Sequence, residues 1–241
     1  MKDFTWTPMG VAYRLAEEQD IQDIRNLWNE NTDWGELTEE TLRERVFDDP
    51  LEPVLLLAHD EDTRKLVGQF LFVPSLLWIR GELKRAFRPA APIVAKGWRD
   101  FGINPLNHLA LKMYREGCGR LKAQGAALIY MVPSATWSRL FKMFPEYNVG
   151  KFPLYKLPLD EREPRLPADA SFQEIGVFDS RIEHLWEKFR GLHEICVVRS
   201  PSVLPIKFRI PNLKIVSVEA RGEVIGLLAM MKKGKQWLIN D

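Results

Sequence analysis

The sequence predicts an α/β protein of the mixed α+β kind. It is expected to have a central mixed, mostly antiparallel sheet flanked by helices, followed by a partial second copy of the same arrangement. From residue 54 onward, apolar segments alternate in the order strand, strand, strand, helix, strand, helix, strand. Two distant segments repeat the same residue types at the same spacing. With 241 residues, 46% of them apolar, the chain is long enough to bury a core in one or two domains.

The first expected elements are strands. Segment 54–58 is apolar, and an acidic turn followed by Val67 and Gly68 indicates a hairpin. Segment 87–95 is typical of a strand but contains Pro89 and Pro92. Because proline has no N–H to donate, this strand is not expected to pair fully along both edges, and we expect it to splay from its neighbour.

A helix is expected next. Apolar residues recur at helical spacing from residue 106 to 121, Pro105 suits the first helical position, and Gly125 is a natural C-terminal stop. A short buried strand is expected over 126–132, and a second helix over 133–144 with Phe141 on its apolar face. Segment 147–159 again has strand character, broken by two prolines.

The turn between the proline-containing strand and the helix has the features of a phosphate-binding site. The first turn of a helix carries backbone N–H groups without partners inside the helix and a partial positive charge. Gly102 permits close backbone approach, and Arg99 offers a planar charged fork. A strand, a turn with Arg and Gly, and a helix therefore predict an anion site.

Segment 94–103, Val-Ala-Lys-Gly-Trp-Arg-Asp-Phe-Gly-Ile, resembles the acyl-CoA-binding turn of the GNAT acyltransferase superfamily. That turn reads Arg/Gln-x-x-Gly-x-Gly/Ala and lies between the fourth strand and the third helix. Segments 66–69, 125–130 and 133–144 also match, so that the resemblance covers about residues 12–159. Two positions depart from the pattern: Asn104 stands where a second Gly or Ala is usual, and Lys96 where Pro is common.

The resemblance implies acetyl-CoA or another acyl-CoA as co-substrate, with no metal. The strand backbone would hold the pantetheine arm, and the turn would hold the pyrophosphate. The implied cofactor-binding residues are Ile93, Val94, Ala95, Arg99, Asp100, Phe101, Gly102, Ile103 and Asn104.

The resemblance assigns no catalytic residue. Many members protonate the leaving thiolate with a Tyr of the last helix, but the aligned position here is Phe141, which cannot donate a proton. Glu82 and His108 are candidate bases, although such residues are more often a solvated turn carboxylate and a capping or surface imidazole. The acidic loop 29–36 around Trp34 occupies the place of the family's substrate loop, and a helix cap with an exposed loop is the favoured interpretation.

An internal repeat predicts a duplication. Residues 20–28 correspond to residues 179–186 if one residue of slack is allowed at the aspartate, and Gly68 follows Trp28 by 40 residues, as Gly226 follows Trp186. We therefore expect a GNAT-like acyl-CoA-binding domain over 1–160, a linker over 161–170 and an incomplete second GNAT-like domain over 171–241. At this offset the second copy would stop before its phosphate turn, which predicts a truncated product or a fragment with an uncovered apolar edge at 237–241.

Charge and cysteine usage limit the partners and the compartment. The chain has 34 Lys and Arg against 33 Asp and Glu, a net charge of +1, so no general attraction to nucleic acid or to an anionic membrane is expected. No segment has the length and apolarity of a membrane span or a secretory signal. Cys118 and Cys196 have no metal-ligand spacing and indicate a reducing compartment, so we expect a cytoplasmic protein. A homodimer is left open.

Three functions are carried forward. The leading hypothesis is an acyltransferase that moves an acyl group, acetyl above all, from acyl-CoA to an amine or hydroxyl of an unidentified small-molecule or peptide acceptor. The first alternative is a FemAB-like aminoacyltransferase, which shares the tandem layout but uses aminoacyl-tRNA. The second is a non-catalytic GNAT-like protein that binds acyl-CoA or a partner.

Overall fold

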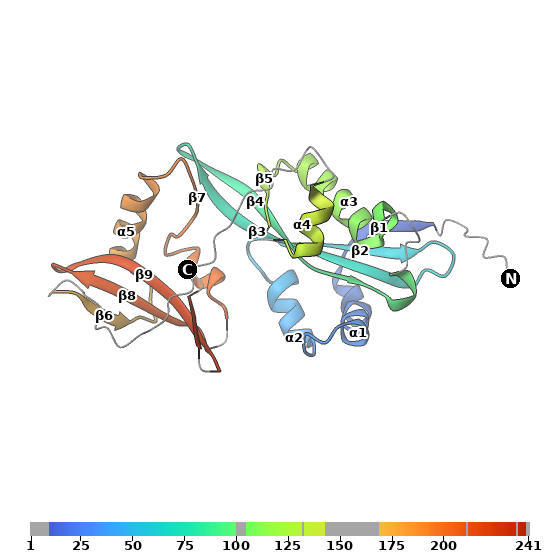
Figure 1. The fold of residues 1–241 in the computed structure, drawn as a ribbon, viewed down its shortest axis with the longest axis horizontal. Helices are drawn as coiled ribbons and strands as arrows, with labels where there is room; N and C mark the ends of the chain where they lie inside the picture. The colour runs from blue at the N-terminus through green and yellow to red at the C-terminus, as the bar shows by residue number, and fades with distance from the viewer. Residues whose placement is uncertain are drawn as a thin grey trace. The chain divides into compact units, whose positions relative to one another are not determined.

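The chain forms two compact units, and each is described by itself. The computed structural model describes residues 10–99, 105–131, 133–142, 169–210, 212–234 and 236–239 (Figure 1). The first unit comprises Met1–Leu77 and Leu83–Met131, and the second comprises Trp78–Glu82 and Val132–Asp241. Residues 161–168 of the predicted linker lie outside the described part of the chain, and the predicted domain boundaries stay a prediction.

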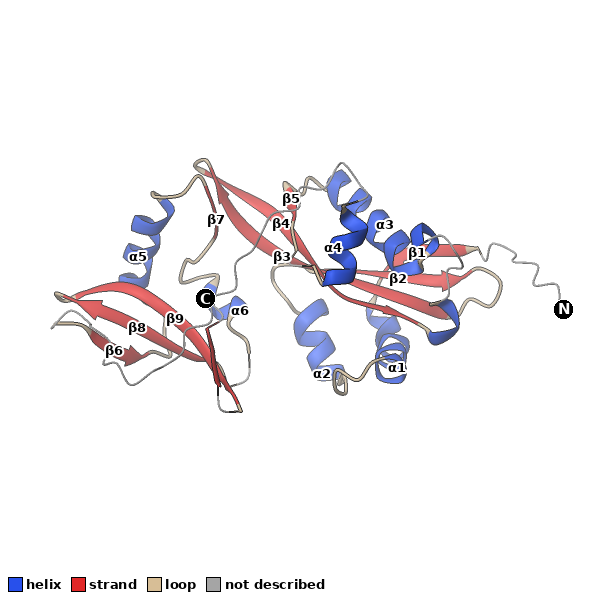
Figure 2. Cartoon of the chain, viewed as in Figure 1, coloured by secondary structure: helices blue, strands red, loops and turns tan. Residues whose placement is uncertain are grey.

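The first unit contains a mixed sheet in the order β1-β2-β3-β4-β5. β1 pairs with β2 and β2 with β3 in antiparallel fashion, whereas β4 and β5 are parallel. The predicted mixed, mostly antiparallel sheet flanked by helices is confirmed (Figure 2). The strands are β1 (Val11–Leu15), β2 (Val54–Asp60), β3 (Leu66–Ile79), β4 (Glu82–Val94) and β5 (Leu128–Ile129). The helices are α1 (Ile21–Asn31), α2 (Glu39–Leu42), which continues into a π-helical turn (Arg43–Phe47), and α3 (Leu109–Ala123).

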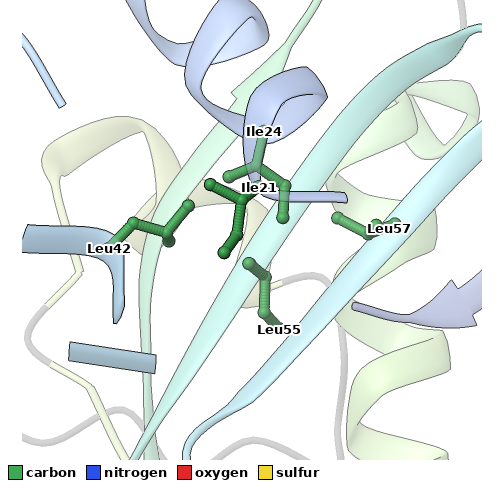
Figure 3. Packing of buried hydrophobic residues seen from close by; sticks show 5 residues of the cluster. All are labelled: Ile21, Ile24, Leu42, Leu55 and Leu57. Atoms are coloured by element: carbon green, nitrogen blue, oxygen red, sulfur yellow. The ribbon is translucent and has the colours of Figure 1, made fainter. Parts of the chain in front are cut away.

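Helices cover both faces of this sheet, with α1 and α2 on one face and α3 on the other (Figure 1). Side chains of alternate strand residues point to opposite faces, so each face carries its own apolar set. A buried cluster joins α1 and α2 to β2 and comprises Ile21, Ile24, Leu42, Leu55 and Leu57 (Figure 3). On the other face, glycines let α3 approach closely, because a Cβ at Gly68 would lie 2.9 Å from Met113 Sδ.

The second unit contains a four-stranded sheet in the order β10-β9-β8-β6, whose pairs are all antiparallel. Its strands are β6 (Ser171–Glu174), β8 (Lys214–Ala220), β9 (Glu223–Lys233) and β10 (Gln236–Ile239), and the short β7 (Ile195–Val197) lies outside this sheet. Its helices are α4 (Ala135–Phe141), α5 (Ser180–Arg190) and α6 (Leu204–Lys207). Ile182 of α5, Leu204 of α6 and Val224 of β9 form its buried cluster. No helix among the described residues is long and apolar enough to cross a membrane.

The two units share a hairpin of the same geometry. In the first unit Ala58 pairs with Gly68, and the register shifts by one residue immediately afterwards. In the second unit Val218 pairs with Gly226, and the register shifts at the same point. The duplication stays a prediction, and this shared glycine and bulge are the structural observation that favours it.

Two predicted elements differ from the structure. The predicted helix start at Pro105 is wrong, since Pro105–Asn107 form a separate 3₁₀ turn and α3 begins at Leu109. The reason is His108, whose ring caps the helix and fixes its start. The predicted buried strand over 126–132 is reduced to Leu128–Ile129, and Leu128 is 42% exposed. Residues 143–159, where the end of the second predicted helix and the last strand-like segment fall, lie outside the described residues.

Candidate acyl-CoA site

β4 and β5 are paired over only a short segment. Ala86 pairs with Leu128 and Phe87 with Ile129. The last backbone hydrogen bond between the two segments, among the described residues, runs from Tyr130 N to Phe87 O at 3.0 Å. β4 continues to Val94, whereas β5 ends at Ile129. The side of β4 beyond Phe87 therefore is not paired with β5, in agreement with the splayed strand expected from the sequence.

Pro89 lies on this unpaired side of β4. The carbonyls of Arg85 and Phe87 both accept hydrogen bonds from residues at or beside β5, Ala127 and Tyr130. Since successive residues of a strand alternate in direction, Pro89 faces the same way as Phe87. Its missing N–H therefore removes no hydrogen bond to β3.

Pro92 faces the same side because the alternation shifts by one residue within β4. Ala95 N donates to Val67 O of β3 at 2.9 Å, so residue 95 faces β3 and residues 92 and 94 face away from it. The shift falls at Ala91, whose φ of 46° is rare for a residue with a Cβ. Neither proline thus interrupts the contact of β4 with β3, and both prolines face the side on which, among the described residues, β5 no longer pairs with β4.

The turn after β4 is tied to the C-terminal end of α1. Lys96 N donates to Asn31 Oδ1 at 3.0 Å. Arg99 Nε donates to Val94 O at 2.9 Å, and Arg99 Nη2 donates to Asn31 O at 2.7 Å. Arg99 thus uses part of its guanidinium to join α1 to the end of β4, a role that the sequence did not reveal.

His108 closes the N-terminus of α3. Its Nδ1 accepts a hydrogen bond from Ala110 N at 3.1 Å, and its carbonyl accepts one from Leu111 N at 3.0 Å. The N–H groups of Ala110 and Leu111 are therefore engaged within the protein and are not available to an anion. Burial, together with the charge of Arg99, lowers the pKa of His108.

This geometry disfavours His108 as a general base. A backbone N–H only donates, so Nδ1 of the neutral ring is the acceptor and the ring proton is on Nε2. Glu82, the other candidate base, is exposed at the tip of the β3–β4 hairpin and belongs to the second unit. His108 is therefore a capping imidazole and Glu82 an exposed turn carboxylate, as the sequence favoured.

The structure describes four of the nine predicted cofactor-binding residues. Ile93 and Val94 are 2% and 5% exposed; Val94 faces the unpaired side of β4, whereas Ile93, like residue 95, faces β3. Ala95 is partly buried, and Arg99 is exposed. The remaining five lie outside the described residues: Asp100, Phe101, Gly102, Ile103 and Asn104.

A hydroxyl pair lies where β4 and β5 separate. Tyr130, whose N–H makes the last bond to Phe87, donates from its phenol to Ser75 Oγ of β3 at 2.8 Å. Nothing in the sequence signals this pair, because Ser75 lies 55 residues before Tyr130. By contrast Phe141, aligned with the tyrosine of the superfamily, is 4% exposed and packs against Trp137 with ring centroids 5.4 Å apart.

The loop after α1 is held by local hydrogen bonds. Trp28 Nε1 donates to Gly35 O at 2.8 Å, and Asn29 Oδ1 accepts from Leu37 N at 2.8 Å. Trp34 is 60% exposed and packs edge-on against Trp28. This is the cap and exposed loop that the sequence favoured.

The comparisons with known proteins concern the fold. No protein-family model matches the chain, and a search of curated proteins finds no match. A probable N-acyltransferase of unknown function from Enterococcus faecalis V583 aligns at TM-score 0.62 and 12% identity, over 95% of this chain and 57% of its own. A GCN5-related N-acetyltransferase from Kribbella flavida aligns at TM-score 0.57 and 11% identity, over 97% of this chain and 57% of its own.

N-myristoyltransferase from Saccharomyces cerevisiae, solved with bound myristoyl-CoA, aligns at TM-score 0.53 and 15% identity, over 98% of this chain and 68% of its own. At such identities the likeness establishes the fold alone. The sheet with its splayed strands, the flanking helices and these alignments agree, and the chain has the GNAT fold that these N-acyltransferases share.

Proposed function

We propose that this chain is an acyltransferase that moves an acyl group, acetyl in the first instance, from acyl-CoA to an amine or hydroxyl acceptor. The observation that carries the proposal is the unpaired side of β4 beyond Phe87, which leads directly into the turn that bears Arg99. The solved proteins of the same fold support it, because they include N-acyltransferases and one that binds myristoyl-CoA.

The residues present fit the two ends of an acyl-CoA. An extended pantetheine arm carries amide groups, which hydrogen-bond to an unpaired strand edge as a further strand would. Of the three residues expected to supply this edge, Val94 faces it and would donate its N–H, whereas Ile93 and Ala95 face β3. Arg99, with residues 100–104, would bind the pyrophosphate. A guanidinium has five N–H donors, and the bonds to Val94 and Asn31 use two of them.

The reaction requires a proton to leave the acceptor and another to reach the thiolate. The amine or hydroxyl attacks the thioester carbonyl, the new C–N or C–O bond forms, and the C–S bond breaks to release CoA as its thiolate. Tyr130 is our candidate for the donor of the second proton, because its phenol is fixed by Ser75 beside the last β4–β5 hydrogen bond.

Calorimetry with acetyl-CoA tests the binding step. We expect saturable binding that Arg99→Ala weakens about tenfold or more, because a charge-assisted bond to phosphate contributes roughly 1.5–3 kcal/mol. Asn31→Ala is the matched control, since it removes the bond from Lys96 N but leaves the Asn31 carbonyl in place for Arg99. Equal weakening by both variants would mean that Arg99 acts only through the fold of the turn. No binding by folded wild-type protein would overturn the proposal.

Turnover separates the enzyme from its alternatives. Release of free CoA thiol is measured with a panel of amines and alcohols, and Tyr130→Phe is expected to lower kcat while leaving acetyl-CoA affinity unchanged. Ser75→Ala, which keeps the phenol but removes its partner, should have a smaller effect on kcat. Tight binding with no turnover for any acceptor would favour the non-catalytic acyl-CoA-binding alternative.

A further inference from the structure

The second unit contains a cavity of about 350 Å³ between α5, α6 and β9. Its floor is buried, since Ile182, Trp186 and Leu204 are 2%, 4% and 0% exposed. Phe189 and Ile225, which also line it, are 42% and 53% exposed and mark its opening to solvent. The cavity therefore runs from an exposed apolar rim to a dry apolar floor.

A small residue in β9 accounts for the space. Ala229, 1% exposed, lines the cavity three residues after Gly226. In the first unit the residue three positions after Gly68 is Leu71, which packs against the buried cluster of α1 and α2. The equivalent hairpin position thus carries a leucine in the unit whose core is filled and an alanine in the unit that has the cavity.

One charged side chain, Arg199, is found among the described residues that line the cavity. It is partly buried, and its Nη1 donates to Val197 O at 3.0 Å, which holds the guanidinium in place. An arginine in an apolar wall favours a carboxylate, which it can bind through parallel hydrogen bonds. The remaining lining is almost entirely apolar and disfavours a ligand with polar groups along its length.

We propose that this cavity binds a medium-chain carboxylic acid, with the alkyl chain on the floor and the carboxylate at Arg199. The volume is at the lower end of the roughly 300–1,000 Å³ typical of small-molecule pockets, which suits a single flexible chain better than a ring system. The site is built entirely from the second unit and stands independently of acyl transfer in the first.

Calorimetry of the full chain with decanoate, below its micellar concentration, tests the proposal. We expect saturable binding that Ala229→Leu abolishes by filling the cavity, and that Arg199→Gln weakens about tenfold. Arg221→Gln is the matched control, because its side chain is 91% exposed and Arg221 is not among the residues that line the cavity, and it should bind as the wild type does. Decanol should bind wild type and Arg199→Gln equally.

A rim variant keeps the test decisive if Ala229→Leu fails to fold. Ile225→Glu changes an exposed residue and places a negative charge at the opening, so it should weaken decanoate far more than decanol. Absence of saturable decanoate binding by folded wild type would overturn the proposal. So would binding that neither Ala229→Leu nor Ile225→Glu changes, which would place the fatty acid elsewhere on the chain. Equal decanoate binding by wild type and Arg199→Gln would overturn the assignment of the carboxylate.

Discussion

The two units contain the same glycine-centred hairpin but cover it differently. In the first unit the face that bears Gly68 lies against α3, and a Cβ there would be 2.9 Å from Met113. In the second unit the nearest atom of the described residues to a Cβ at Gly226 belongs to Val218, at 3.9 Å, which is an ordinary contact. Phe172, on the same face by its register through Val218, is 50% exposed.

The difference shows that this hairpin does not by itself require a glycine. In the second unit the buried cluster joins α5 and α6 to Val224, on the opposite face from Gly226, so among the described residues no helix of this cluster presses on the glycine. The steric requirement at Gly68 comes from the helix that packs on it. A larger side chain is therefore sterically disfavoured at Gly68 but should be tolerated at Gly226.

The largest effect is expected where α3 approaches the sheet most closely. A Cβ at Gly117 would lie 2.2 Å from the ring of Phe72, which is fully buried. We expect Gly117→Ala to reduce the free energy of unfolding by about 3 kcal/mol, because a rigid ring in a filled core must move. Gly119 in the same helix is exposed, and no atom of the described residues lies within 4 Å of a Cβ built there, so Gly119→Ala should stabilise by up to about 1 kcal/mol.

Urea denaturation measures the free energy of unfolding of Gly117→Ala and Gly119→Ala. Equal effects of the two substitutions would show that α3 does not press on β3, and the contrast between the two units would fail. A loss at Gly117 that Phe72→Leu partly restores would attribute it to the ring itself.

The aspartates at the start of α1 and α5 form a second contrast. Asp20 is 6% exposed and accepts two hydrogen bonds from Arg14, at 2.6 and 2.5 Å, whereas Asp179 accepts from Arg181 N at the surface. The bonds from Arg14 lower the pKa of Asp20. We expect Asp20→Asn to destabilise by about 2 kcal/mol, because the buried Asp20 loses its charge-assisted bonds to the partly exposed Arg14.

Asp179→Asn should have a clearly smaller effect, since asparagine is also a good N-cap and the position is solvated. Thermal unfolding measures both. A greater loss at Asp179 than at Asp20 would contradict the view that burial decides the contribution of these aspartates.

Substitution of the hairpin glycines, Gly68 and Gly226, should change the free energy of unfolding less, and it compares the two units directly. Gly68→Ala is expected to destabilise by about 1 kcal/mol, because the nearest atoms belong to the flexible end of Met113, which is itself fully buried. Gly226→Ala should be neutral or slightly stabilising. Chemical denaturation of the two variants in parallel provides the measurement, and a destabilised Gly226→Ala would indicate that a segment covers this face.

The local part of the fold could be predicted from the sequence. The predicted apolar strand 54–58 lies within β2, and the helical spacing over 106–121 covers most of α3. The start of α3 could not be predicted, because it depends on the His108 side chain and not on the proline that helices commonly have at their first position. The length of β5 depends on where its partner strand diverges, which is a tertiary property.

In the candidate site, too, local features could be predicted from the sequence and tertiary contacts could not. The proline pattern of β4 correctly indicated an incompletely paired strand, because proline acts on the residue's own hydrogen bonding. The bonds of Arg99 to Asn31 and of Tyr130 to Ser75 join residues 68 and 55 positions apart, and no periodicity encodes them. The cavity of the second unit likewise depends on Ala229 facing α5, which only the folded arrangement reveals.

The smallest predicted effect concerns the pH dependence of the first unit. Burial and the neighbouring Arg14 lower the pKa of His59, and they prevail over the opposite influence of Asp20 and Asp23. Arg14 Nη2 lies 3.4 Å from His59 Nε2, and because a guanidinium only donates, Nε2 must be the unprotonated nitrogen. The folded protein therefore holds His59 neutral more firmly than the unfolded chain does.

The sign of the effect follows from proton binding. Below the ordinary histidine pKa of about 6.5, the unfolded state takes up a proton that the folded state resists, so the free energy of unfolding falls as the pH is lowered. His59→Gln should remove part of this fall, by less than about 1 kcal/mol between pH 7 and pH 5.5. Urea denaturation of wild type and variant at both values measures the difference. An identical pH dependence in the two proteins would show that His59 accepts its proton as readily in the folded chain, and that the Arg14 contact does not constrain it.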